Sequence, residues 1–288
     1  MKYGLALAGG GTRGAAHVGV LKALNEAGLM PEAVAGASAG GIVAGLLASG
    51  MVISEMEKAV RHLAKYGYEY LDPDYTGLLE FMPQLLAGRG VSLSGLIKGN
   101  KLLKYFAGLT GGKHLDEAVM KLVIPSVDLM SGQTICFTNC DNTERVDHVR
   151  WDWEGYLCEI MMASASVPAI FAPRKMGLYV LVDGGVTDNL PGNLLQAAGV
   201  PIVIAVDIGG SYTAPADTSI IEVASHSFTI MSSRLKECGS TGEVLLLKPP
   251  LPSDAGLLTF DKMVECMEAG YRYTLRMVPQ IWKALSEG

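Results

Sequence analysis

The segment from Ala33 to Ser54 contains no charged residue and is long enough to cross a membrane as a helix. It is also rich in small residues, with serines at positions 38 and 49 among the glycines Gly36, Gly40, Gly41, Gly45 and Gly50. A short buried strand, a tight turn and a buried helix explain this pattern better than a membrane span. We therefore predict a strand over Ala33–Gly36 and a helix over Ala39–Ala48 inside a globular domain.

The residues before that segment predict the same order of elements. Tyr3–Ala8 is a short apolar run typical of a buried strand, and Gly14–Ala27 has apolar residues at helical spacing, closed by Gly28. Such a strand–helix–strand–helix beginning is typical of a parallel sheet covered on both faces. The predicted fold class is α/β, with three layers (α/β/α), a mostly parallel central sheet, and Ser38 on the elbow between a strand and a helix.

The remainder of the chain supplies further strands and two helices. Glu154–Ala165 and Asp261–Leu285 have helical patterns, and Pro279 is a point where the second could be interrupted. Strands are predicted at Leu122–Val127, Thr134–Thr138, Leu178–Val182, Ile202–Val206 and Val244–Leu247. The length of 288 residues fits a single domain, predicted over residues 1–288. Residues 65–114 break the α/β pattern, and we interpret them as an insertion with short helices, similar to a lid.

Composition excludes some classes of protein. The net charge of −6 argues against nucleic acid as the main partner. Five cysteines at loose spacings indicate free thiols in a reducing compartment and form no zinc-binding pattern. The apolar run at the N-terminus is too short for a signal peptide. We therefore expect a cytoplasmic protein without a metal site.

The sequence Gly36-Ala37-Ser38-Ala39-Gly40 matches the pattern G-x-S-x-G. A nucleophilic serine needs a sharp turn between a strand and a helix so that its hydroxyl stands exposed, and the flanking glycines allow that turn. The helix that follows directs its positive N-terminus at the negative charge that develops during acyl transfer. Ser38 is therefore the candidate nucleophile.

A glycine loop, Gly9-Gly10-Gly11-Thr12-Arg13-Gly14, follows the first predicted strand and matches G-x-G-x-x-G. One interpretation is a dinucleotide-binding loop, but neither Glu26 nor Glu32 is well placed as the acidic residue that such a site needs. The other interpretation is an oxyanion hole made of backbone N–H groups. In that case Arg13 adds positive charge near the hole or near a substrate phosphate.

Three acids compete for the role of catalytic partner. Asp183 follows the predicted strand Leu178–Val182 and precedes two glycines, at the edge where α/β sheets display functional groups. Asp188 and Asp207 are rivals, and Asp207 is the stronger one because it also ends an apolar strand. The residues alone leave this choice open.

Three motifs together resemble the patatin-like phospholipase family: GGGTRG (Gly9–Gly14), GASAG (Gly36–Gly40) and DGG (Asp183–Gly185). Further segments are similar to the family's first helix, its hairpin and the region of its catalytic aspartate, namely AAHVGVLKAL (Ala15–Leu24), VDLMSGQTICF (Val127–Phe137), ASASVPAIFAP (Ala163–Pro173) and DGGVTDNLP (Asp183–Pro191). The resemblance covers most of the chain outside residues 65–114 and the C-terminal tail.

The resemblance implies a serine lipid acyl hydrolase, of the phospholipase A, lysophospholipase or esterase type, which cleaves carboxylic esters through an acyl-enzyme. It implies a Ser–Asp dyad in which Asp183 takes the proton of Ser38. It further implies an oxyanion hole formed by Gly10 and Gly11 with Arg13 nearby, and no cofactor or metal. The remaining motif residues are Gly9, Gly14, Gly36, Gly40, Gly184 and Gly185.

The histidines bear on the alternative of a triad. A triad in the usual α/β-hydrolase order needs a histidine after the acid, and His226 is the only histidine after Asp183. It lies in a segment rich in serine and threonine, without the context of a strand end. His17 is expected to be a packed or capping residue. The simpler expectation is a dyad.

The implied partner is a lipid or phospholipid ester, with possible peripheral contact to a membrane. Lys98, Lys101 and Lys104 recur every three residues among apolar side chains, which is typical of a helix on a lipid surface and equally of an ordinary solvated helix. Three other functions stay open: a regulatory or storage protein with little turnover, nucleotide binding through the glycine loop, and acyl transfer to an acceptor other than water.

Overall fold

The computed structural model describes residues 2–74, 95–209, 214, 219–238 and 242–287. The strands of these residues join one sheet in the order β5-β4-β3-β2-β1-β8-β9, with β7 added to β3 and β6 to β7. The strands are β1 (Gly4–Leu7), β2 (Ala33–Gly36), β3 (Lys121–Asp128), β4 (Thr134–Thr138), β5 (Val149–Asp152), β6 (Arg174–Met176), β7 (Tyr179–Asp183), β8 (Val203–Val206) and β9 (Leu245–Leu247).

The middle of the sheet is parallel. β1 pairs in parallel with β2 and β8, β2 with β3, and β8 with β9, whereas β3 pairs antiparallel with β4 and β7. β1, β2 and β8 are buried along their whole length, as expected for parallel strands covered on both faces. The α/β fold and its mostly parallel sheet are confirmed. The prediction of one domain over residues 1–288 stays a prediction.

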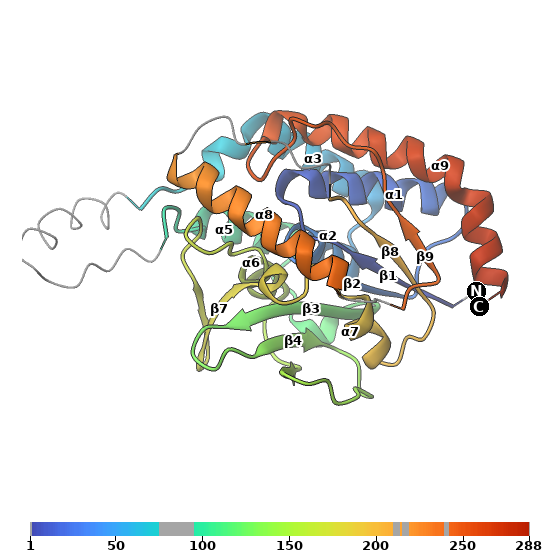
Figure 1. Ribbon diagram of the computed structural model, residues 1–288, viewed down its shortest axis with the longest axis horizontal. Helices are drawn as coiled ribbons and strands as arrows, with labels where there is room; N and C mark the ends of the chain where they lie inside the picture. The colour runs from blue at the N-terminus through green and yellow to red at the C-terminus, as the bar shows by residue number, and fades with distance from the viewer. Residues whose placement is uncertain (1, 75–94, 210–213, 215–218, 239–241, 288) are drawn as a thin grey trace, which may run out of the picture.

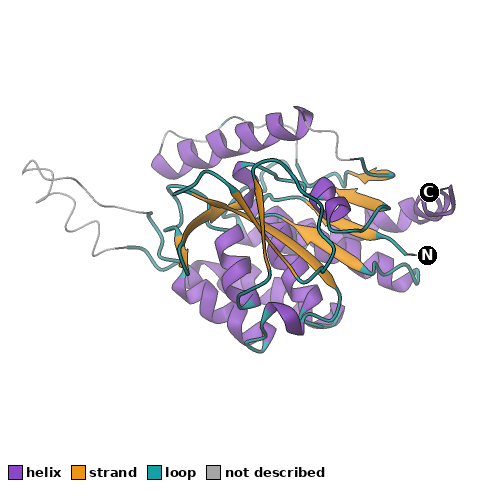
Figure 2. Ribbon diagram, turned by 90° about the horizontal axis from the view of Figure 1, so that it is seen from below, coloured by secondary structure: helices purple, strands orange, loops and turns teal. Residues whose placement is uncertain are grey.

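Helices cover both faces of the sheet (Figures 1 and 2). α1, α2, α3, α5, α6 and α9 gather on one face, and α7 and α8 lie on the other. The helices are α1 (Ala15–Glu26), α2 (Ala39–Ala48), α3 (Ile53–Tyr66), α5 (Asn100–Thr110), α6 (Leu157–Ser164), α7 (Gly192–Ala197), α8 (Ile220–Cys238) and α9 (Met263–Glu287).

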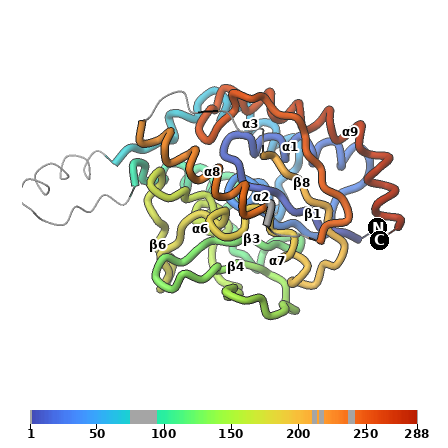
Figure 3. The backbone as a smooth tube through the Cα atoms, in the orientation of Figure 1, coloured from blue at the N-terminus to red at the C-terminus, as the bar shows by residue number. Residues whose placement is uncertain are grey.

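Helix α9 runs beside α1, although the two stand at opposite ends of the chain (Figure 3). Glycines permit this close packing. A Cβ atom on Gly19 would lie 1.9 Å from the Met267 carbonyl oxygen, and one on Gly270 would lie 2.2 Å from that of Ala16. The helix continues through Pro279 to Glu287, so the interruption considered there does not occur. The buried side chains of Ile281 and Leu285 hold its last turns against the domain.

The uncharged segment Ala33–Ser54 forms β2, a turn, α2 and the start of α3, as predicted for its first part. In the part of the chain that the structure describes, no helix is long and apolar enough to span a membrane. The pattern of α3 was missed because its charged residues hide a narrow apolar stripe, in which only Met56, Ala59 and Val60 are buried.

The predicted insertion is partly described. It contains the 3₁₀ turn η2 (Gly67–Tyr70) and α5, while residues 75–94 lie outside the described residues. Ile97 pairs with Pro73 and Phe171 in isolated bridges, which ties the described part to the domain. The lid-like character of residues 65–114 stays a prediction.

Candidate active site

Ser38 stands on the turn between β2 and α2 with φ 53° and ψ −123°, a left-handed conformation that residues other than glycine rarely adopt. The turn requires glycine on both sides. A Cβ on Gly36 would lie 2.2 Å from the Gly40 carbonyl oxygen, and one on Gly40 would lie 2.2 Å from that of Leu7. The Ser38 hydroxyl makes no capping hydrogen bond to α2, so it is left for chemistry at the positive end of that helix.

Asp183 ends β7 opposite Ser126 of β3 and is completely buried. Its Oδ1 accepts a hydrogen bond of 2.7 Å from the Gly185 N–H, whereas its Oδ2 has no partner of normal hydrogen-bond geometry. Burial raises the pKa of this carboxyl to about 7, and interactions with the Ser38 hydroxyl and the Gly185 N–H oppose that rise. The structure therefore brings Ser38 and Asp183 together, with one carboxylate oxygen unused.

The glycine loop runs past both residues. A Cβ on Gly9 would lie 2.9 Å from the Ser38 Cβ and 2.3 Å from the Asn189 side-chain oxygen, and one on Gly14 would lie 2.5 Å from the Ala39 Cβ. Gly11 has φ +59°, and the N–H groups of Gly10 and Gly11 donate no hydrogen bond to a described residue. Two backbone donors beside the serine suit an anionic oxygen.

Asn189 connects the glycine loop to the Asp183 turn. Its carbonyl oxygen accepts a hydrogen bond of 3.0 Å from the Gly9 N–H, and its side-chain oxygen would lie 2.7 Å from a Cβ on Gly185. Gly184 must also lack a side chain, because a Cβ there would lie 2.2 Å from the Pro125 carbonyl oxygen. Steric crowding therefore explains why the motif Asp183-Gly184-Gly185 has glycine at both positions after the aspartate.

Ser164, at the end of α6, is a residue that sequence reasoning missed. Its hydroxyl accepts a hydrogen bond of 3.1 Å from the Ser38 N–H and donates one of 2.6 Å to the Pro125 carbonyl oxygen. The nearby Ser166 carbonyl oxygen accepts from the Asp183 N–H at 2.9 Å. The segment Ser164–Ser166 thus holds the backbones of Ser38 and Asp183. Its serines stand out in the sequence, but their partners are remote along the chain.

Beside Ser38 lies an apolar pocket of about 110 Å³. Ile42, Leu102, Phe106, Met162, Val167 and Phe171 form much of its wall. Ser38 and Thr12 are its polar side chains, so the pocket suits a hydrocarbon chain attached to a group that the serine can reach. Leu102 and Phe106 belong to α5, whose apolar side therefore faces the pocket.

The rival acids have other partners. Asp207 forms an ion pair with Lys236 at 2.6 Å and accepts from the Gly209 N–H. Asp188 accepts a hydrogen bond of 3.1 Å from the Leu190 N–H within its own turn. Asp183 interacts with the Ser38 hydroxyl, whereas the partners of Asp188 are Leu190 and Asn193. The structure thus favours Asp183 among the three candidates.

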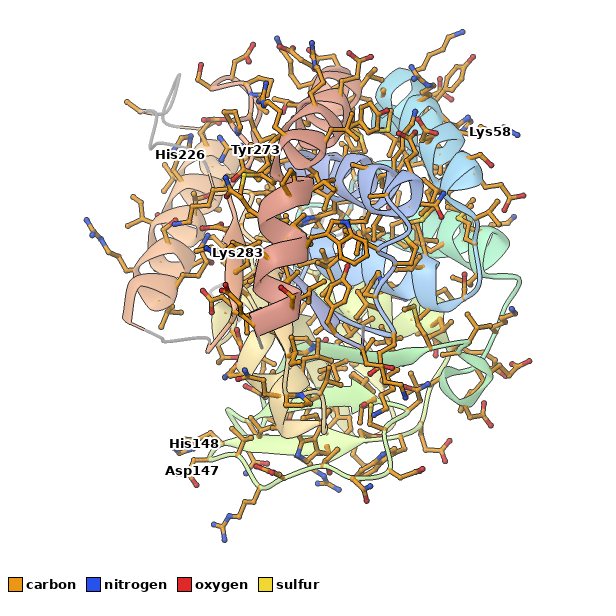
Figure 4. All side chains as sticks on the ribbon, turned by 90° about the vertical axis from the view of Figure 1, so that its right-hand side faces the viewer. Lys58, Asp147, His148, His226, Tyr273 and Lys283 are labelled. Carbon is orange, nitrogen blue, oxygen red and sulfur yellow. The ribbon has the colours of Figure 1, made fainter. Side chains whose placement is uncertain are left out.

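Three of the five histidines can be compared with the position that a triad would require. His17 is fully buried, with its Nε2 bound to the Ala8 carbonyl oxygen, and burial lowers its pKa to about 4. His226 lies on α8, where its Nε2 is 3.1 Å from a carboxylate oxygen of Glu222, and His148 lies beside Asp147 in a distant part of the molecule (Figure 4). None of these rings lines the pocket.

Arg13 lies beside the glycine loop, since a Cβ on Gly10 would lie 3.8 Å from the Arg13 Cβ, and its role near an oxyanion hole stays a prediction. Its Nε donates a hydrogen bond of 2.6 Å to the Ala255 carbonyl oxygen, and its side chain does not line the pocket beside Ser38. Leu257 also covers the loop, because a Cβ on Gly11 would lie 2.5 Å from the Leu257 Cα. A dinucleotide would have to displace this contact, and β2 ends in Gly36 rather than in an acid. Among the described residues no group of three or more His, Cys, Asp and Glu could hold a metal ion.

Comparisons with known proteins define the class. The family model described as "Patatin-like phospholipase" matches residues 5–195, which is more than half of the chain. The chain belongs to the patatin-like phospholipase family. The crystal structure of VipD from Legionella pneumophila is similar in fold, with a TM-score of 0.52 and 15% sequence identity over 96% of this chain and 67% of that one.

Curated relatives fall in the same family. An uncharacterized NTE family protein of Mycobacterium tuberculosis is 26% identical over 75% of this chain and 51% of its own length. The neuropathy target esterase of Drosophila melanogaster is 28% identical over 72% of this chain and 13% of its own. A lysophospholipase of Yarrowia lipolytica is 25% identical over 96% of this chain and 19% of its own. The chain spans about half the length of the first of these relatives, and less of the others.

The Ser164 hydroxyl gives a first prediction. Ser164→Ala leaves the Ser38 N–H and the Pro125 carbonyl without their buried partner, so we expect it to lower the free energy of unfolding by about 1–3 kcal/mol. Ser166→Ala is the matched control, because that hydroxyl only adds a bond to the Met162 carbonyl oxygen and its loss should cost less. Denaturant unfolding measures both. Equal losses in the two variants would contradict the bridging role of Ser164.

Proposed function

We propose that this chain hydrolyses carboxylic esters of lipids, with Ser38 as the nucleophile and Asp183 as the general base. The observation that carries the proposal is a serine held in a left-handed turn, facing a fully buried carboxylate, beside an apolar pocket. The names of the fly and yeast relatives, an esterase and a lysophospholipase, support an ester as the substrate class.

The proposed reaction has two halves. Asp183 takes the proton of the Ser38 hydroxyl as Oγ attacks the ester carbonyl, and the N–H groups of Gly10 and Gly11 bind the oxyanion of the tetrahedral intermediate. The intermediate expels the alcohol, which receives the proton from Asp183, and the acyl group stays on Ser38. Water then attacks the acyl-enzyme as Asp183 accepts its proton, the bond between the acyl carbon and the Ser38 Oγ breaks, and Asp183 returns the proton to Oγ as the fatty acid leaves. Arg13 acts here as a positioning residue through the glycine loop.

Variants at the two central residues test the proposal. Ser38→Ala and Asp183→Asn should each lower kcat/KM toward a nitrophenyl ester by roughly a thousandfold or more, because they remove the nucleophile and its base. His226→Ala is the matched control and should keep wild-type activity. Full hydrolysis by Ser38→Ala would refute the proposed nucleophile. Loss of activity in His226→Ala with retention in Asp183→Asn would instead indicate a triad.

The products separate the alternatives that share this site. Release of free fatty acid from a panel of phospholipids and lysophospholipids supports hydrolysis, whereas an acylated acceptor supports acyl transfer. A folded protein that binds these lipids without turnover supports a regulatory role.

The pH dependence follows from Asp183. The base is the carboxylate form, and the pKa of this group lies at about 7, so kcat/KM should fall about tenfold for each pH unit below that value. Since the folded pKa is raised above the unfolded one, the wild type should also lose stability relative to Asp183→Asn as pH rises from about 4 through 7. Two results would contradict the assignment of this pKa to Asp183. One is a kcat/KM that does not change between pH 5 and 8, and the other is a fall of kcat/KM at low pH that disappears in His226→Ala.

We also propose peripheral membrane contact, through α8 rather than α5. In α5, Leu102 and Phe106 are buried, and Lys101 donates to the Glu69 carbonyl oxygen. The outer face of α8, in contrast, exposes apolar side chains, with Ile220 70%, Met231 57% and Val223 51% exposed. On its inner side the Ser232 hydroxyl donates to the Gly185 carbonyl oxygen, which places this helix over the Asp183 turn.

Cosedimentation with phosphatidylcholine vesicles tests this contact. Val223→Glu combined with Met231→Glu should reduce binding severalfold, because charged groups replace apolar surface at the interface. Lys104→Glu on α5 is the control and should leave binding unchanged. The opposite pattern would move the membrane contact back to the basic helix.

A further inference from the structure

One part of the pocket wall comes from a segment of the chain beyond the matched family region. Leu257, Leu258, Phe260 and Met263 line the pocket there. They belong to the segment Ala255–Met263, which includes the 3₁₀ turn η5 (Phe260–Lys262) and leads into α9. The family model ends at residue 195. This wall is therefore a feature of the chain's own C-terminal region.

The segment Ala255–Met263 is fastened to the glycine loop. The Thr12 N–H donates to the Leu257 carbonyl oxygen at 3.2 Å, and the Thr12 hydroxyl donates to the Gly256 carbonyl oxygen at 2.7 Å. Arg13 adds its bond to Ala255, and the Thr259 hydroxyl accepts from the Gly256 N–H at 2.6 Å. These bonds fix the position of the wall relative to the loop that carries Gly10 and Gly11.

Phe260 is the largest side chain of this wall and is 6% exposed. Its ring packs against Gly67, where a Cβ would lie 2.1 Å from the Phe260 Cδ1, and it meets the Tyr68 ring edge-on at 5.1 Å between centroids. η2 therefore supports the ring from behind. The ring is thus held in place as part of the pocket wall.

The size of the pocket sets the expected ligand. Its volume of about 110 Å³ is smaller than the ~150 Å³ apolar cavity that accommodates one benzene molecule. It therefore holds about four or five carbons of a hydrocarbon chain.

We propose that the segment Ala255–Met263, through Phe260, selects esters of short acyl chains by forming part of the wall of the acyl pocket and so keeping its volume small. This proposal rests on the proposed function of Ser38. It assigns Phe260 to substrate specificity and leaves the chemical step to Ser38 and Asp183.

Chain-length profiles test the proposal. Wild type should favour butanoyl and hexanoyl nitrophenyl esters over octanoyl and dodecanoyl esters. Phe260→Ala should raise the octanoyl-to-butanoyl ratio of kcat/KM at least tenfold, because each newly buried methylene contributes about fourfold. If the Phe260→Ala variant does not fold, Phe260→Leu is tested instead, and we expect a smaller rise in the octanoyl-to-butanoyl ratio of kcat/KM. Met267→Ala on α9 is the control, since Met267 is buried but does not line the pocket. An unchanged ratio in folded Phe260 variants, or an equal shift in Met267→Ala, would overturn the proposal.

A binding experiment separates this proposal from the proposed function. In the Ser38→Ala background, calorimetry with hexanoate, octanoate and dodecanoate reports the pocket without turnover. If adding Phe260→Ala makes the longer acids bind more tightly, Phe260 limits the length of the bound chain. This result holds whether or not the wild type hydrolyses esters. Identical affinities with and without Phe260 would exclude this role of Phe260. Absence of hydrolysis by the wild type would count against the proposed function alone.

Discussion

The whole site depends on one tight turn, in which Ser38 has a left-handed backbone between β2 and α2. A non-glycine residue in such a conformation costs of order 1–3 kcal/mol and persists only where the surroundings impose it. Here α2 packs so closely on β1 and β2 that Gly36 and Gly40 have no room for a side chain. The Ser164 hydroxyl fixes the Ser38 N–H. This strained backbone conformation directs the Ser38 side chain toward Asp183.

The burial of Asp183 is the second condition. The carboxyl sits at the end of β7, inside the sheet, with one oxygen bound by Gly185 and the other unpaired. Desolvation raises its pKa to about 7, into the range where a carboxyl exchanges protons near neutral pH. His17 is buried and neutral, His226 is paired with Glu222, and neither ring lines the pocket beside Ser38. The proposed two-residue mechanism follows from this arrangement.

Sequence reasoning predicted the local features well because glycine requirements and apolar runs are written in short segments. Ala33–Gly36 and Ala39–Ala48 were predicted to the residue, and the glycine positions around Ser38 have the steric cause expected. The contributions of Ser164, Asn189 and Phe260 could not be predicted, because their partners lie far away along the chain. The bond from the Arg13 Nε to the Ala255 carbonyl oxygen could not be predicted either, because the two residues lie at opposite ends of the chain. α3 and α8 were missed because their polar residues obscure their apolar faces.

Covalent labelling tests the central claim most directly. The protein is treated with an alkyl fluorophosphonate across a range of pH, and the modified peptide is mapped by mass spectrometry. The account predicts a single adduct on Ser38, whose rate of formation rises through about pH 7 in the wild type and is low at every pH in Asp183→Asn. An adduct on another residue, or equal rates in the wild type and Asp183→Asn, would contradict the pairing of Ser38 with Asp183.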